Sequence, residues 1–321
     1  MSDQKIVISE DLRNWLVLIA LGLVWGSSFI LIKRSLLAFS ATQVACLRMS
    51  FSAIAFMPLV FWHWSKIDWS RLRYLIIVGL TGTALPAIFF ATAQTQISSS
   101  LAGILNSLTP LFTLILGLLF FNAKAGWKKI LGVALGLAGA SILILMTGNT
   151  QVDGNIWYAL LVVLAALCYA TSSNVVGNYL KDMNALIISA ASFGLVGIPG
   201  LIYLLAGTNF VYRMGHVDYA WTALGYVSIL ALVGTVAASV LFFRLIQWTS
   251  PLFSSTVAYL VPIIALFWGV LDGESIYFFH FVGMSLILAG VYLSRRKRTR
   301  PGGGLAQPTP TVEPLNQQSN K

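Results

Sequence analysis

The sequence predicts an all-α integral membrane protein of ten transmembrane helices, arranged as two inverted five-helix repeats. Three observations lead to this fold class. Of the 321 residues, 58% are hydrophobic and only 9% are charged, whereas soluble domains carry about a quarter charged residues. The apolar residues lie in long continuous runs, and about 20 such residues cross a bilayer as a helix. The third observation is an internal duplication of the chain.

Ten apolar runs are separated by short connections, most of which contain a charged residue, Gly, Asn or Asp. They cover residues 14–32, 41–62, 74–93, 98–121, 127–147, 156–179, 185–205, 220–246, 252–271 and 277–294. Each run is long enough to span the hydrocarbon core at about 1.5 Å per residue. The first run is too long for the core of an ordinary signal peptide, so no cleaved leader is expected.

The distribution of positive charge predicts the orientation. If the N-terminus is inside, 16 of the 20 Lys and Arg residues fall in inside segments; Lys33, Arg34 and Arg213 fall in outer loops, and Arg48 falls within a span. Positive charge is retained in the cytoplasm during insertion. Both termini are therefore predicted to be cytoplasmic, in the cell inner (plasma) membrane. The net charge of +10 is then a topology signal, and no nucleic-acid partner is expected.

An internal repeat divides the chain into two halves. A shift of 152 residues places Leu80-Thr81-Gly82-Thr83 on Leu232-Val233-Gly234-Thr235, Pro110 on Pro262, and Gly117 on Gly269. Matching Pro and Gly in register is harder to obtain by chance than matching Leu. We predict a first repeat over residues 14–147 and a second over residues 156–294.

The segments outside the repeats are a leader and a tail. Residues 1–13 form a cytoplasmic N-terminal leader. Residues 295–321 begin with a basic cluster and continue with Pro, Gly, Gln and Asn. Such a tail cannot bury enough apolar surface to order itself, so it is predicted to be a disordered cytoplasmic segment.

Five spans per repeat place the second repeat upside down relative to the first. Inverted repeats with a substrate site near the bilayer midplane are typical of transporters. Two similar halves can exchange conformations, so that a site between them opens alternately to either side. The structural alternative is a duplication that only builds a stable bundle.

Several motifs resemble those of the EamA-like family in the drug/metabolite transporter superfamily. They are Trp25-Gly26-Ser27-Ser28-Phe29 leading to Lys33, Leu47-Arg48, Leu108-Thr109-Pro110-Leu111-Phe112, Pro262, Gly273-Glu274, and Gly283 through Leu288-Ala289-Gly290. The resemblance covers nearly all of residues 14–294 and implies export or exchange of small metabolites. One departure is Asn122-Ala123-Lys124 after the fourth span, where family members often carry Gly-Glu.

Arg48 is the one charge predicted inside a span, about two turns from its outer end. Inserting an arginine at the centre of a membrane helix costs about 2.5–3.5 kcal/mol on insertion scales, so an ionisable residue there is by default a candidate for a functional role. Arg48 is predicted to attract a substrate carboxylate or phosphate. The alternative is an arginine that snorkels to the interface or caps backbone carbonyls.

Pro110 and Pro262 lie in the middle of equivalent spans. Proline removes a backbone hydrogen bond and kinks a helix, so we predict that these two helices form hinges and cavity walls. Asn106 and Tyr259 lie close to the prolines and would supply polar groups. A packing kink with satisfied polar groups is the alternative.

Trp25 and Ser28 in the first span and Tyr169 and Asn174 in the sixth occupy corresponding places in the two halves. An aromatic ring beside small polar groups near the midplane suits an amphiphilic organic solute. Alternatively, such polar groups join neighbouring helices.

These observations predict a transporter that exports or exchanges small organic metabolites, with amino acids or related solutes as the expected class. The alternatives are a carrier for hydrophobic drug-like or phosphorylated solutes, and, in a different class, a passive channel or a membrane interaction protein. No carboxylate lies well inside a predicted span, and the chain has no HExxH or CxxC motif. We therefore expect no enzyme activity, catalytic residue, metal or cofactor. A small-molecule substrate and the lipid bilayer are the expected partners, while the oligomeric state is left open.

Overall fold

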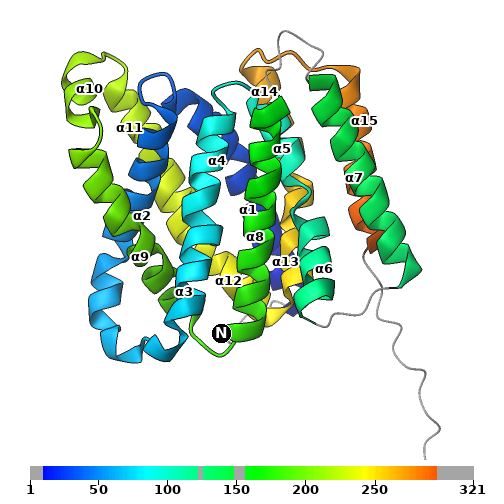
Figure 1. Ribbon diagram of the computed structural model, residues 1–321, viewed down its shortest axis with the longest axis horizontal. Coiled ribbons are helices and arrows are strands. Elements are labelled where there is room, and N and C mark those ends of the chain that lie inside the picture. The colour runs from blue at the N-terminus through cyan, green and yellow to red at the C-terminus, as the bar shows by residue number, and fades with distance from the viewer. Residues whose placement is uncertain (1–9, 122–125, 148–155, 295–321) are drawn as a thin grey trace, which may run out of the picture.

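The computed structural model describes residues 10–121, 126–147 and 156–294, which form helices and turns and contain no strand. The helices run side by side between the two ends of a bundle (Figure 1). The first half comprises α1 (Glu10–Ser35), α2 (Ala41–Trp62), α3 (Leu72–Gly79), α4 (Leu85–Ala93), α5 (Ser99–Asn106), α6 (Thr109–Phe120) and α7 (Trp127–Thr147). The second half comprises α8 (Ile156–Tyr179), α9 (Ala185–Ala206), α10 (Phe210–His216), α11 (Ala220–Ala231), α12 (Ala238–Trp248), α13 (Pro251–Ser255), α14 (Leu260–Leu271) and α15 (Phe278–Ser294).

Eight helical stretches in these described ranges are long and apolar enough to cross a membrane. Two further apolar stretches, Ile130–Leu143 in α7 and Phe278–Gly290 in α15, are shorter. A helix lies at each of the ten predicted spans, although several of these spans are interrupted. The all-helical membrane architecture is thus confirmed, while ten crossings and their inverted arrangement stay predictions.

Polar caps fix where several helices begin. The Ser98 hydroxyl accepts from the Leu101 amide at 3.2 Å, and the Ser250 hydroxyl accepts from the Phe253 amide at 3.1 Å. These bonds satisfy amides that have no partner within the helix. Ser98 and Ser250 are also corresponding residues of the two predicted repeats, so α5 and α13 begin in the same way.

Irregular backbone occurs at corresponding places in the two halves. π-Helical segments cover Leu80–Ala84 between α3 and α4, and Leu232–Ala237 between α11 and α12. The predicted span 98–121 is broken into α5 and α6 at residues 107–108, and a 3₁₀ segment, Thr256–Tyr259, separates α13 from α14. Single-turn π segments occur frequently at functional sites, which draws attention to the Gly-Thr pair that both of them contain.

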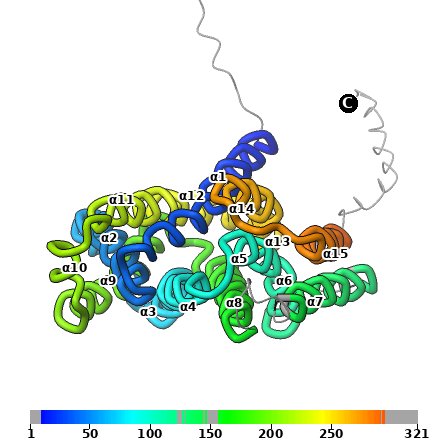
Figure 2. Tube along the Cα trace, turned by 90° about the horizontal axis from the view of Figure 1, so that it is seen from above, coloured from blue at the N-terminus to red at the C-terminus, as the bar shows by residue number. Residues whose placement is uncertain are grey.

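The helix contacts follow a paired pattern. α7 packs against α15 and α2 packs against α9, and α7 and α15 lie side by side at one edge of the bundle (Figures 1 and 2). α1 and α8 are the first helices of the two halves. α1 packs against α14 of the second half, and α8 packs correspondingly against α6 of the first half. In the same way, α1 contacts α11 and α12, and α8 contacts α3 and α4. Exchanging the corresponding segments of the two halves therefore reproduces the main contacts.

The buried apolar side chains form clusters between the helices. One cluster of buried side chains includes Phe29, Phe90 and Val261, and a second includes Phe56 and Phe193. Both clusters combine residues from the two halves of the chain. The halves are therefore packed into one another and do not form separate bundles.

The first helix is longer than predicted. It ends at Ser35, so Lys33 and Arg34 lie in its last turn and the prediction that they lie in an outer loop is wrong. Cations in the last turn are stabilised by the helix dipole, and both of these pair with Asp272. The predictions for the leader before Glu10, the tail after Ser294 and the Asn122-Ala123-Lys124 departure lie outside the described residues.

Candidate functional site

An interior cavity of about 80 Å³ lies between helices of both halves. The first half contributes Trp25, Ser28, Arg48 and Asn106, and the second half contributes Tyr169. These are five of the seven side chains predicted from the sequence to contact substrate. The remaining wall is mainly aromatic with hydroxyl groups, and includes Phe29, Phe90, Thr109, Ser172, Ser239, Phe242 and Phe243. Among the described residues that line the cavity, none is acidic.

Arg48 is the cation of this cavity and is only 7% exposed. Its Nε donates to the hydroxyl of Thr235 at 2.8 Å, and that hydroxyl donates to the Leu230 carbonyl at 3.2 Å. The guanidinium also interacts with the Tyr169 hydroxyl. No carboxylate of the described residues forms an ion pair with Arg48. The Nε contact fixes the guanidinium plane. The two terminal amino groups carry four N–H donors, so donors besides the one at Tyr169 are available to a ligand.

Trp25 is held by the same π-helical segment. Its indole Nε1 donates to the Gly234 carbonyl at 2.9 Å, and its ring meets Phe242 edge to face at 4.9 Å between centroids. Gly234 also lies close to Ser28: a Cβ on this glycine would be only 3.1 Å from the Ser28 hydroxyl. The segment Leu232–Ala237 therefore orients both the aromatic ring and the cation of the cavity.

The other cavity groups are constrained by local contacts. The Ser28 hydroxyl donates to the Val24 carbonyl at 3.0 Å, so only its lone pairs can meet a ligand. The Tyr169 ring stacks near Phe90, with 5.9 Å between centroids. The described lining of the cavity is thus largely aromatic, with small hydroxyl groups and a single cation, Arg48.

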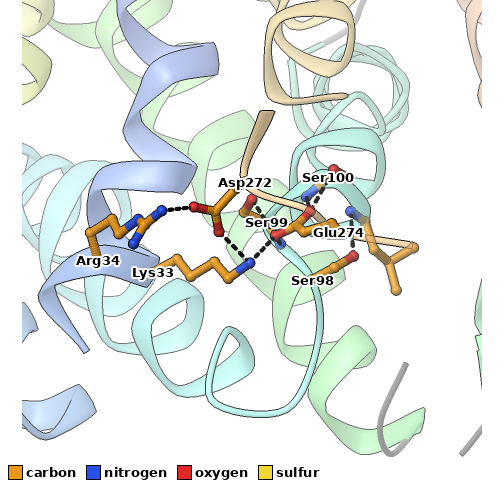
Figure 3. Close-up of polar contacts among 8 residues, drawn as sticks. Lys33, Arg34, Ser98, Ser99, Ser100, Asp272 and Glu274 are labelled. Carbon is orange, nitrogen blue, oxygen red and sulfur yellow. Dashed lines mark hydrogen bonds and ion pairs between the residues drawn. The ribbon is translucent and has the colours of Figure 1, made fainter. Parts of the chain in front are cut away.

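A second polar cluster lies where α1 ends, α5 begins and α14 ends (Figure 3). Lys33 Nζ contacts an Asp272 carboxylate oxygen at 2.7 Å and a Glu274 oxygen at 2.8 Å, and Arg34 pairs with Asp272. Glu274 also accepts from the amides and hydroxyls of Ser99 and Ser100, at 2.6–3.0 Å. The cluster thus links both halves of the chain.

The chain resembles known membrane transporters over most of its length. The profile of the EamA-like transporter family matches it twice, over residues 13–145 and 156–296. The chain belongs to this family. An uncharacterized transporter of Archaeoglobus fulgidus is 22% identical over 89% of this chain and 100% of its own length. The uncharacterized inner membrane transporter YedA of Escherichia coli is 26% identical over 86% of this chain and 88% of its own length.

The fold is also shared with a solved structure. A crystal structure of a protein that is 15% identical in sequence superposes with a TM-score of 0.59, covering 88% of this chain and 96% of the other. At this identity the likeness concerns the fold alone. The EamA family assignment makes the chain a multi-pass membrane transporter, in agreement with its eight long apolar helices in the described residues.

Two predicted site residues of this EamA transporter do not line the cavity. Asn174 Nδ2 donates to the carbonyls of Thr113 at 3.1 Å and Ala170 at 3.0 Å, and thereby joins α8 to α6. Tyr259 is half-buried in the 3₁₀ segment before α14. A contact between either residue and substrate in another conformation stays a prediction.

The two prolines lie just after the helix breaks. Pro110 is near the start of α6, and Pro262 near the start of α14. Proline deprives the Asn106 carbonyl of its helical donor, and the Thr109 hydroxyl replaces that donor at 2.8 Å. The break is therefore satisfied within the protein, as required at membrane depth. Movement about these breaks stays a prediction.

Sequence reasoning missed the cluster around Glu274. Lys33, Asp272 and Glu274 all lie outside the predicted spans, and their mutual contacts cross more than two hundred residues of sequence. Gly273-Glu274 after one helix and Lys33 near the end of another were visible as family motifs. Their spatial pairing was not, because it depends on how the halves pack.

Glu274 predicts an acid-sensitive contribution to stability. Burial disfavours its charge, but hydrogen bonds from Lys33, Ser100 and Ser99 outweigh burial and hold its pKa at about 2, below the usual 4.5. A depressed pKa stabilises the fold above the unfolded pKa, and this stabilisation is lost as pH falls through the folded pKa. We expect thermal stability in detergent to fall as the pH is lowered from 4.5 to about 2, and to fall less in Glu274→Gln. An equal fall in the parent protein and in Glu274→Gln would contradict this assignment. Asp218→Asn, which removes an exposed carboxylate, is the control and should lose stability in acid as the parent does.

Proposed function

We propose that this EamA-family chain carries a small organic solute, an amino acid or a related metabolite, across the inner membrane by alternating access between two inverted repeats. The observation that carries the proposal is the cavity itself. It is lined by both halves, and it contains a single buried cation, Arg48, with no acidic residue among its described lining.

Corresponding features of the two halves support the repeat. The capping serines, the π-helical segments and the broken helices recur at a shift of 152 residues. The family profile also matches each half once. If α7 and α15 cross the membrane together with the eight longer stretches, each half has five spans. An odd number inverts the second half relative to the first.

The charge distribution supports an orientation with both termini in the cytoplasm. α1 begins and α15 ends at the same end of the bundle (Figure 1). The connections α2–α3 and α8–α9 also lie at this end and carry Lys66, Arg71 and Lys181, and Arg73 follows in the first turn of α3. Because positive loops are retained inside, this end would face the cytoplasm and the Glu274 cluster would face outward.

The substrate class follows from the groups that a ligand would meet. A carboxylate would pair with the terminal amino groups of Arg48, an interaction that is strong and directional where water is excluded. An apolar side group would contact Trp25, Phe90 and Phe242. An isolated amine would find no carboxylate partner among the described lining residues, so a purely cationic solute would bear the cost of desolvation without compensation.

Counterflow in proteoliposomes tests the function. Purified protein is reconstituted with a high internal concentration of one unlabelled solute, and uptake of the same labelled solute is followed for a panel of amino acids, sugars and nucleotides. A carrier is expected to accumulate label transiently above equilibrium for at least one amino acid or related carboxylate, because exchange needs no net driving force. Empty liposomes are the control. Uptake that only equilibrates, with no overshoot, would indicate a channel.

A further inference from the structure

The loop between α14 and α15 turns sharply and sends an acidic side chain back towards the bundle. Gly273 has φ 77°, a left-handed conformation that glycine adopts without strain. The amides of Gly273 and Glu274 donate to the carbonyls of Val270 at 3.1 Å and Gly269 at 2.9 Å, which is the pattern of a Schellman motif. This turn places the Glu274 carboxylate at the first residues of α5.

The Glu274 carboxylate is buried among its partners. Its side chain is 4% exposed, and it receives five hydrogen bonds, from Lys33 and from the amides and hydroxyls of Ser99 and Ser100 (Figure 3). The amides at the start of a helix favour a negative charge. Separating α5 from this loop would therefore leave a buried carboxylate without the serine amides and hydroxyls that it accepts from, which is energetically costly.

The cluster joins elements that also form the cavity wall. Ile32, next to Lys33, lines the cavity, as does Asn106 at the end of α5. Gly269 of α14 permits the close approach, because a Cβ there would overlap the Ser100 hydroxyl. Lys33 and the two serines belong to the first half, whereas Asp272 and Glu274 belong to the second.

The sequence of the first repeat has no carboxylate at the position that corresponds to Glu274. At the shift of 152 residues, Glu274 corresponds to Asn122, and the sequence has no Asp or Glu between Asp68 and Asp153. The ion pairs of the described residues that involve Asp68 and Asp182 are more exposed, with side-chain exposures of 42% and 85% for the two acids. The described ion pairs at the other end are thus more exposed, and the sequence has no carboxylate at the position that corresponds to Glu274.

We propose that Lys33, Asp272 and Glu274 form an ion-pair gate, which closes the cavity at the end where α1 terminates and must break before the cavity opens there. This inference rests on the carrier function proposed above. The first and second halves separate at this end only when Glu274 leaves Ser99 and Ser100. Weakening the gate then favours the conformation that is open to this side, and access from the other side does not increase.

Cysteine labelling tests the gate without requiring a known substrate. Ser28→Cys places a thiol in the cavity, in a Cys46→Ala/Cys168→Ala background whose folding is checked by gel filtration. A membrane-impermeant maleimide is added to sealed right-side-out or inverted vesicles, and the labelling rate is measured from each side. Gly215→Cys in α10, at the same end as the gate, identifies which vesicles present that end.

Lys33→Gln and Glu274→Gln are each expected to raise the labelling rate of the introduced cavity thiol from the gate side by at least about fivefold. This is the lower end of the range by which one site typically shifts the equilibrium at another. Lys33→Arg, which keeps the charge, and Asp218→Asn, an exposed acid at the same end, should label at the parental rate. Lys33→Gln leaves the serine contacts of Glu274 in place, so it decides the matter if Glu274→Gln does not fold.

Two results would overturn the gate. In the first, folded variants label at the parental rate from both sides, which would make the cluster a static brace between α1, α5 and α14. In the second, labelling rises equally from both sides, which would indicate general loosening. If counterflow fails for the tested solutes but labelling rises from the gate side only, the gate is retained and the proposed substrate class is refuted. The gate and the proposed function can therefore fail separately.

Discussion

Arg48→Ala is expected to lower the uptake of carboxylate solutes by at least about thirtyfold, because truncating one partner of a buried charge pair typically costs about 2–5 kcal/mol. Arg48 is buried in the cavity, and Thr235 fixes its Nε at 2.8 Å. Phenylalanine and phenylethylamine form a suitable pair of probes, since both contain the ring and the amine but only phenylalanine has a carboxylate. Their binding is measured by thermal shift, and transport by counterflow.

Two variants at this site and one control elsewhere separate the effect of the Arg48 charge from that of its contact with Thr235. Arg48→Lys keeps the charge but loses the Thr235 contact, so partial function is expected. Thr235→Val keeps the arginine and removes its acceptor, so a rise in KM without loss of folding is expected. Arg244→Ala removes an exposed cation of α12 and should change nothing. If Arg48→Ala weakens phenylalanine no more than phenylethylamine, Arg48 is a structural residue.

Gly290→Ala is expected to lower the thermal stability of the protein more than Gly283→Ala, the change at the other glycine of α15. A Cβ at Gly290 would overlap the Gly132 carbonyl and the backbone of Gly136 in α7. Backbone atoms cannot move aside as a flexible side chain can, so α7 and α15 must separate. Overpacking of this kind typically costs about 1–3 kcal/mol, and small residues at such contacts are what permit close helix packing in membranes.

Gly225→Ala provides the matched control for this prediction. It lies within α11, and a Cβ there meets no atom within 4 Å. Alanine is favoured over glycine in a helix by about 1 kcal/mol, so this variant should be as stable as the parent or more stable. Both proteins are compared by thermal unfolding in the same detergent. A parental midpoint for Gly290→Ala would mean that α7 and α15 can accommodate a methyl group between their backbones.

Much of the fold could be predicted from residue order alone. Long apolar runs predict helices because a membrane leaves few other ways to satisfy the backbone, and every predicted span contains a helix. The breaks near Pro110 and Pro262 were also predictable, since proline acts on its own helix. Trp25, Ser28, Arg48, Asn106 and Tyr169 line the cavity, and their contact with a substrate stays a prediction.

Asn174 and Glu274 mark the limit of that reasoning. The Asn174 amide looked equivalent to the other midplane polar groups, yet it joins α8 to the Thr113 carbonyl of α6. Glu274 looked like an ordinary residue at the end of a span, yet its carboxylate caps α5. Whether a polar group faces a neighbouring helix or the cavity depends on helix rotation, and apolar runs carry little information about rotation when they are hydrophobic on all sides.

The chain's own residues determined that it is a helical membrane protein with two similar halves, because hydrophobic length and internal similarity are properties of sequence. Tertiary structure decided which charges meet: Arg48 with Thr235 inside the cavity, and Lys33 with Glu274 at one end. Those pairs join segments far apart in the chain, and electrostatic attraction acts over a few ångströms in space, whatever the separation in sequence.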